Sequence, residues 1–109
     1  MEKINVYYKQ EVALYFNQLI FELYEKEYFG FLEDAIDYKN KIIDFIDKNI
    51  GSISFKNTPL PLISLGSYYI FYNSNKRTTW YIFFEKSKNI FLITHISNNH
   101  SPLASFLND

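Results

Sequence analysis

Two short polar segments in the second half of the chain carry the side chains best suited to chemistry. Lys76 and Arg77 stand side by side between two apolar runs, and Asn98-Asn99-His100 follows the last apolar run. An imidazole exchanges protons near neutral pH, while lysine and arginine bind phosphate oxygens. The two segments therefore predict contact with phosphate or ribose, in which the asparagines and cations bind and His100 acts as a general base or acid. Each segment also has a simpler interpretation, because asparagine favours turns and cations at a turn tip keep a protein soluble.

His95 and Tyr81 are further candidates for catalysis, and each has a structural alternative. His95 and His100 are the two histidines of the chain; they lack helical i, i+4 spacing and have no acid between them, so we expect no metal site. Bonding of each histidine to its own backbone is the simpler interpretation. Tyr69 and Tyr81 are expected to keep exposed rings, which either pack across strands or stack on nucleobases.

The composition excludes several classes of function. The chain has no cysteine, which rules out disulfides and thiolate zinc sites. Its three scattered glycines cannot form a phosphate loop or a dinucleotide fingerprint, and we expect no cofactor. No apolar run reaches the length of a membrane span, and the first residues lack the apolar segment of a signal peptide. We therefore expect a cytoplasmic protein without a membrane partner.

Length and charge indicate one domain with two electrostatic halves. A chain of 109 residues with 48% hydrophobic and 20% aromatic residues suits a single ring-rich core, so the domain is expected to span 1–109. Residues 1–54 hold six lysines against ten acids, a charge of −4, and residues 55–109 hold five cations against two acids, a charge of +3. The five cations of the basic half are few compared with the basic surface of a dedicated nucleic-acid-binding protein.

The first half of the chain predicts a strand followed by two helices. Apolar and polar residues alternate over 4–8, which is typical of a short strand. From Lys9 to Glu25 the apolar residues recur at i, i+3, i+4 and i+7, which predicts an amphipathic helix. Gly30 is the expected turn, and a second apolar stripe predicts a helix from Leu32 that ends at Gly51.

The second half predicts a connector, three strands and a short helix. Pro59 and Pro61 indicate an extended connector over 52–66 that forms no helix. Three aromatic and β-branched runs between 68 and 98 predict an antiparallel meander in which Trp80, Ile82 and Phe84 face the helices. Ser101-Pro102 is typical of a helix start, and a short helix is expected through residue 106. The expected fold is α+β, with a helix hairpin on one face of a mostly antiparallel four-stranded sheet in the order β-α-α-β-β-β.

This order of elements is similar to that of the RelE/ParE superfamily of type II toxin–antitoxin toxins. The resemblance covers nearly the whole chain in element order, and three segments carry it in residues: LYEKEYFG at 23–30, NKRTTWYIFF at 75–84 and NNH at 98–100. Three departures are apparent, and one is that the helices lack the lysine-rich face of many ribosome-bound members. Tyr81 stands where RelE-like nucleases often have an arginine, and the residues after the last strand are not rich in arginine and lysine.

The resemblance implies a growth-arresting toxin neutralised by an antitoxin protein. RelE-like members cut messenger RNA on the ribosome, and ParE-like members inhibit DNA gyrase. In an RNA-cleaving member, His100 would serve as base or acid and Arg77 would hold the phosphate, with Tyr81 and His95 as further catalytic candidates. The antitoxin is expected to bind through apolar contacts more than through charge. The alternative is a non-catalytic protein-interaction module that retains the same fold.

Overall fold

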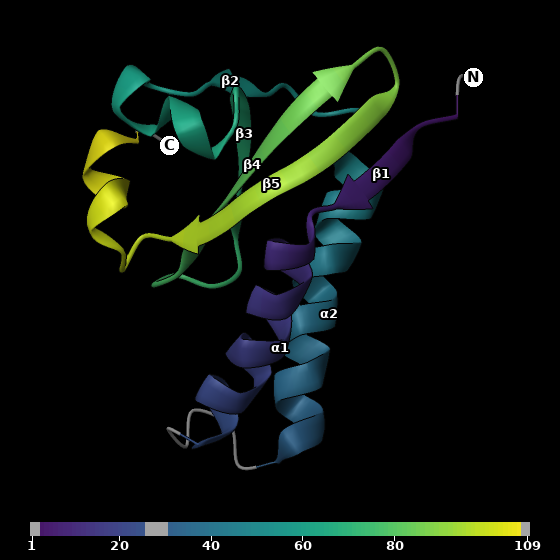
Figure 1. Cartoon of the computed structure of the whole chain (residues 1–109). Coiled ribbons are helices and arrows are strands. Elements are labelled where there is room, and N and C mark those ends of the chain that lie inside the picture. The colour runs from purple at the N-terminus through teal and green to yellow at the C-terminus, as the bar shows by residue number, and fades with distance from the viewer. Residues whose placement is uncertain (1–2, 26–30, 108–109) are drawn as a thin grey trace.

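The computed structural model describes residues 3–25 and 31–107, which form two long helices, five strands and two 3₁₀ helices (Figure 1). In chain order these are β1 (Asn5–Tyr8), α1 (Gln10–Glu25), α2 (Leu32–Asn49), β2 (Lys56–Asn57), η1 (Leu60–Leu65), β3 (Tyr68–Asn73), β4 (Thr79–Ser87), β5 (Ile90–Asn98) and η2 (Pro102–Phe106). The expected strand, two helices and meander all form. The predicted turn at Gly30 lies outside the described residues. In the described segments, neither helix is long and apolar enough to cross a membrane.

The sheet is mixed and has five strands in the order β1-β5-β4-β3-β2. The α+β class is confirmed, but the prediction of four strands is wrong because the connector adds β2, in which Lys56 lies opposite Tyr69 on β3. β1 pairs in parallel with β5, and the other pairs are antiparallel. This arrangement places β4 at the centre of the sheet, between β5 and β3.

The connector between α2 and β3 also contains η1, which the sequence analysis did not predict. Pro59 occupies the cap position before this 3₁₀ helix and Pro61 lies in its first turn. The missing N–H of proline costs nothing in a first turn, because that group has no partner within the helix there. The expectation that two prolines forbid a helix is therefore wrong for this short helix. The predicted C-terminal helix does form, as η2, with Pro102 in its first turn.

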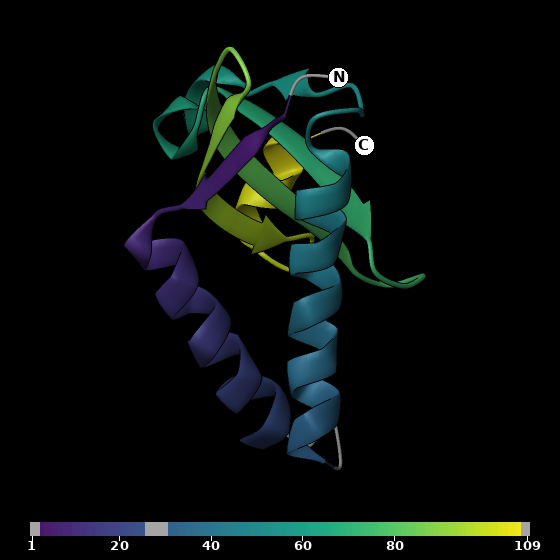
Figure 2. The same cartoon turned by 90° about the vertical axis from the view of Figure 1, so that its right-hand side faces the viewer.

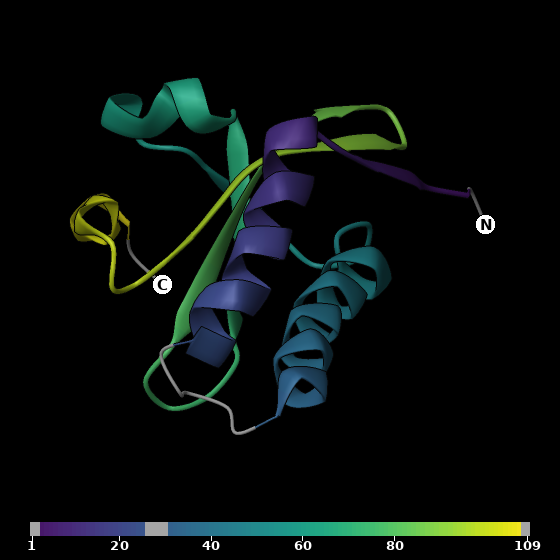
Figure 3. The same ribbon diagram turned by 60° about the horizontal axis from the view of Figure 1, so that its bottom comes forward.

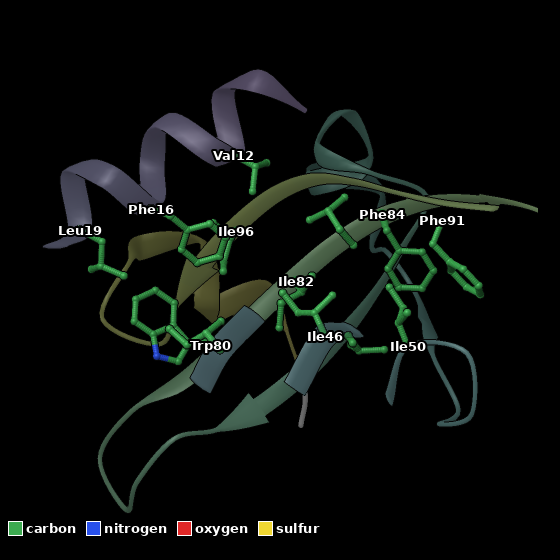
Figure 4. Packing of buried hydrophobic residues seen from close by; sticks show 13 residues of the cluster. Val12, Phe16, Leu19, Ile46, Ile50, Trp80, Ile82, Phe84, Phe91 and Ile96 are labelled. Atoms are coloured by element: carbon green, nitrogen blue, oxygen red, sulfur yellow. The ribbon is translucent and has the colours of Figure 1, made fainter. Parts of the chain in front are cut away.

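One face of the sheet packs against the two long helices, as the alternation on β4 predicts. Trp80 is 2% exposed, and Ile82 and Phe84 are fully buried. Figure 4 shows Phe16 of α1 directed at the sheet beside Ile96, with the Trp80 indole next to them. Figure 2 shows that the last turn of α1 and the first turn of α2 lie remote from the sheet, so both helices extend beyond it. This face holds the larger of two hydrophobic clusters.

The opposite face of the sheet is covered as well, by η1 and η2. Figure 3 shows both 3₁₀ helices on the side of the sheet away from α1 and α2. Under them lies a second hydrophobic cluster, and its buried members are Leu62, Tyr69, Tyr81, Phe83 and Leu107. The prediction that Tyr69 and Tyr81 keep exposed rings is wrong, since they are 3% and 2% exposed. β4 is apolar on both faces from Trp80 to Phe84, which is typical of a strand covered on both sides.

A β-bulge on β5 lies in close contact with Gly66, the residue that precedes β3 by two positions. Phe83 lies opposite His95 and Phe84 opposite Ile93, so Thr94 is the extra residue on β5. The Thr94 hydroxyl donates a hydrogen bond to the carbonyl oxygen of Leu65. A Cβ atom on Gly66 would lie 2.6 Å from the Thr94 hydroxyl oxygen and 2.9 Å from the Phe84 backbone nitrogen. Only glycine fits at this position without moving the backbone.

Gly66→Ala is therefore expected to destabilise the fold by about 1–3 kcal/mol, because the new methyl group meets backbone and a bonded hydroxyl. Urea unfolding followed by circular dichroism measures this difference. Gly51→Ala is the matched control, since its Cβ would meet the end of the flexible Ile4 side chain at 2.9 Å. Equal losses in the two variants would show that the contact with Thr94 and Phe84 is not the cause.

Candidate functional site

The two polar segments singled out in the sequence lie together at one rim of the sheet. β4 starts where β5 ends, and their antiparallel register places Trp80 opposite Asn98. The turn that joins β3 to β4 therefore lies beside the residues that follow β5. We define the rim cluster as Asn75, Lys76, Arg77, Thr78, Asn98, Asn99 and His100.

The β3–β4 turn is held by an asparagine side chain, and this leaves its cations to solvent. The side-chain oxygen of Asn75 accepts hydrogen bonds from the backbone N–H groups of Arg77, at 2.8 Å, and Thr78, at 2.9 Å. The backbone N–H of Ser74 donates to the carbonyl oxygen of Thr78 at 3.0 Å. Lys76 and Arg77 are both exposed at the tip. Their backbone is fixed while their charged groups remain accessible.

The side-chain amides of Asn98 and Asn99 form hydrogen bonds with the backbone of the protein itself. The side-chain oxygen of Asn98 accepts from the backbone N–H of His100 at 2.9 Å. Asn99 bridges the two segments: its side-chain oxygen accepts from the Thr79 N–H at 3.1 Å, and its amide nitrogen donates to the Arg77 carbonyl oxygen at 3.0 Å. These contacts agree with the turn interpretation of the two asparagines. Their predicted role in binding stays a prediction.

His100 carries the imidazole of the rim cluster. The side chain is exposed, and its Nε2 atom lies 3.3 Å from the Thr78 hydroxyl oxygen. This contact joins the imidazole to the turn that carries Arg77. An accessible imidazole on the same rim as two exposed cations can exchange a proton with a bound ligand whose negative charge the cations hold.

His95 and Tyr81 lie elsewhere, so the structure does not assemble all of the predicted catalytic residues in one place. Tyr81 is buried under η1 and η2 in the second cluster. His95 lines a groove of about 320 Å³ between α1 and β5, and the other lining residues are Glu11, Val12, Leu14, Tyr15, Gln18, Thr94 and Ile96. Partial burial lowers the pKa of His95 below the ordinary value for histidine. No group of three histidine or acidic side chains that could hold a metal ion occurs in residues 3–25 and 31–107.

The lowered pKa of His95 predicts a pH-dependent share of stability. Because the unfolded chain binds a proton at His95 more readily than the folded chain, this share is fully present above about pH 6.5 and declines as pH falls towards the folded pKa. His95→Gln is expected to flatten the fall in the urea midpoint between pH 7.5 and pH 5.5. Glu11 lines the same groove. Both proteins keep Glu11, so the difference between them reports on His95. If the urea midpoint falls as steeply with decreasing pH in His95→Gln as in the wild type, the pH dependence does not come from His95.

Two residues outside the rim cluster that the sequence analysis did not single out, Ser74 and Tyr38, support it. Thr78 contacts His100, while Ser74 and Tyr38 bond to each other at 2.9 Å beneath the turn. Tyr38 continues the buried stripe of α2, four residues before Ile42, and that spacing is the signal that could have placed it against the sheet. No local pattern pairs it with Ser74.

No family model, curated protein or solved structure matches this chain. The RelE/ParE resemblance therefore rests on residues 23–30, 75–84 and 98–100 and on the order of elements.

Proposed function

We propose that this chain is the toxin of a type II toxin–antitoxin module of the RelE/ParE type, and that it acts on RNA in the cytoplasm through the rim cluster. The observation that supports RNA as the target is the contact between His100 and the turn that carries Lys76 and Arg77. A base and two cations on one fixed frame are the groups that cleavage next to a ribose 2′-hydroxyl requires.

In the proposed reaction, His100 takes the proton of the 2′-hydroxyl and the freed oxygen attacks the adjacent phosphorus. The bond from phosphorus to the 5′ oxygen breaks, and that oxygen takes a proton from water. Arg77 binds the phosphate oxygens, where negative charge develops, and Lys76 adds a second positive charge. The exposed position of all three side chains allows a ribosome-bound RNA strand to reach them.

The test is induced expression followed by mapping of messenger RNA cuts. The double variant Lys76→Ala/Arg77→Ala is expected to cut RNA about 10²-fold more slowly, by analogy with loss of a charge-stabilising donor. The matched control is Lys86→Ala/Lys88→Gly, which removes one cation from the far end of β4 and one from the turn that follows it. Glycine suits position 88 because its φ is 55°. Equal loss of cutting in both double variants would argue against a specific site at the rim cluster.

A second candidate function, inhibition of gyrase by binding, is favoured by a different observation. η1 and η2 cover the sheet face that carries Tyr69 and Tyr81, so these tyrosines are not open to stack on bases. Growth arrest without messenger RNA cuts, together with loss of DNA supercoiling, would support this function over RNA cleavage. Absence of growth arrest would support the non-catalytic interaction module.

The surface best suited to the proposed antitoxin is the outer side of α1 with the adjoining edge of β5. β1 pairs with β5 only from Ile90 to Ile93, so within the described residues the stretch from Thr94 to Asn98 has a strand partner on one side only. An extended segment could add to such an edge through backbone hydrogen bonds. The helix beside it is apolar and acidic: Leu14 and Phe21 are more than half exposed, and α1 contains three glutamates and no lysine or arginine.

The antitoxin segment is therefore expected to combine apolar side chains with lysine or arginine. The double variant Leu14→Ser/Phe21→Ser should weaken capture of the co-expressed antitoxin at least tenfold, because it removes apolar contact area. Leu60→Ser is the control, since Leu60 is 83% exposed but lies on η1 across the sheet. Affinity that collapses between low and moderate salt would contradict the expectation that apolar contacts dominate.

A further inference from the structure

A buried tryptophan on β4 is hydrogen-bonded to a tyrosine of α2 beneath the rim cluster. The Trp80 Nε1 atom donates to the Tyr38 hydroxyl oxygen at 2.9 Å. The two rings meet edge to face, with centroids 6.2 Å apart. Trp80 is 2% exposed, so its N–H depends on this acceptor. This pair fixes the position of the Tyr38 hydroxyl relative to the sheet.

The hydrogen bonds beyond Tyr38 run in one direction. The Ser74 hydroxyl donates to the carbonyl oxygen of Thr78 at 3.2 Å, which uses its one proton. Either hydroxyl can be the donor in the bond of 2.9 Å between Tyr38 and Ser74, and we assign Tyr38 because the Ser74 proton is used on Thr78. The sequence of donors is Trp80 N–H, Tyr38 O–H and Ser74 O–H, and it ends on the backbone of Thr78. Each hydroxyl both accepts and donates, so every link depends on the one before it.

The end of this relay is the part of the turn that holds the functional side chains. Thr78 follows Arg77 directly, and its hydroxyl contacts His100. A hairpin tip supported only by its own backbone is among the less stable parts of a fold. Here the relay connects the tip to α2, whose neighbouring residue Ile42 is fully buried.

We propose that Tyr38 is a positioning residue of the rim cluster, which sets the Ser74–Thr78 turn and, through Thr78, the imidazole of His100. Its effect on activity depends on the proposed function, whereas its effect on the geometry of the turn does not. Displacement of a reacting group by about 1 Å can cost 10²-fold in rate. Loss of the Tyr38 hydroxyl should therefore lower activity without removing any group that touches RNA.

The test uses Tyr38→Phe, which keeps the ring against Trp80 and removes the hydroxyl, and Ser74→Ala, which breaks the next link from the surface side. The readout is the NMR signals of the His100 ring and of the backbone amides of 75–78 in the full chain, with RNA cleavage measured in parallel. Each single variant is expected to shift these signals and to slow cleavage about 10-fold to 10²-fold. Because both variants break the same relay, the double variant should change the signals little further.

Tyr8→Phe is the matched control, since it removes a tyrosine hydroxyl that donates to Asp47 at 2.7 Å, on β1 and away from the rim cluster. Wild-type signals for His100 and the turn in Tyr38→Phe or in Ser74→Ala would overturn the proposal, and so would fully additive shifts in the double variant. If Tyr38→Phe fails to fold, Ser74→Ala decides the outcome alone. Shifted signals in a chain that cuts no RNA would support the positioning role while rejecting RNA cleavage.

Discussion

Tyr81→Ala is expected to lower the free energy of unfolding by about 3–5 kcal/mol, as large-to-small substitutions of buried aromatic residues do. Tyr81 is 2% exposed in the cluster under η1 and η2, where its ring meets Tyr69 edge to face at 6.3 Å. The substitution would leave a cavity in the cluster that Tyr81 shares with Phe83 and Leu62. Thermal unfolding measures the effect, and the midpoint should fall by more than about 12 °C.

Tyr7→Ala is the matched control for this substitution, because Tyr7 is 57% exposed on β1. Tyr81→Phe separates packing from chemistry, since it keeps the ring and removes the hydroxyl. Growth arrest should survive in Tyr81→Phe and should be lost in Tyr81→Ala through unfolding. A stable Tyr81→Phe variant without growth arrest would instead assign the hydroxyl to the reaction, as the sequence analysis proposed.

His100→Ala is expected to slow RNA cleavage by about 10²–10⁴-fold, the usual contribution of general acid–base catalysis. The thermal midpoint should stay nearly unchanged, because His100 is exposed and its side chain makes one hydrogen-bonding contact, with Thr78, among the described residues. Messenger RNA cleavage mapping after induced expression measures the first effect, and thermal unfolding measures the second. His95→Ala is the control, because His95 lies in the groove between α1 and β5.

Each other outcome for His100→Ala has a definite meaning. Unfolding of the variant would make the residue structural. A folded variant that still arrests growth would show that His100 is not catalytic. Growth arrest without RNA cuts in all four of Arg77→Ala, Tyr81→Phe, His95→Ala and His100→Ala would favour the gyrase-type function.

The sequence alone determined the order of the two long helices and of strands β1, β3, β4 and β5, and the face of β4 that packs against the helices. Apolar periodicity is a local property: a period near 3.6 predicts α1 and α2, and alternation predicts the side of Trp80. α1 begins at Gln10, one residue after the predicted Lys9, and α2 ends at Asn49, two residues before the predicted Gly51. Local propensity and burial agree in these elements, so no distant contact was needed to choose between alternatives.

Tertiary structure alone decided what covers the second face of the sheet and which polar residues meet. The burial of Tyr81 depends on η1 and η2, which lie about 20 residues away in the chain on either side. The meeting of Arg77 with Asn99 depends on the register of β4 with β5, and the bond between Tyr38 and Ser74 spans 36 residues. Alternation along a strand shows which residues share a face but not whether another element covers it. Long-range pairing therefore placed His100 against Thr78, in the turn that carries Arg77, and left His95 in the groove.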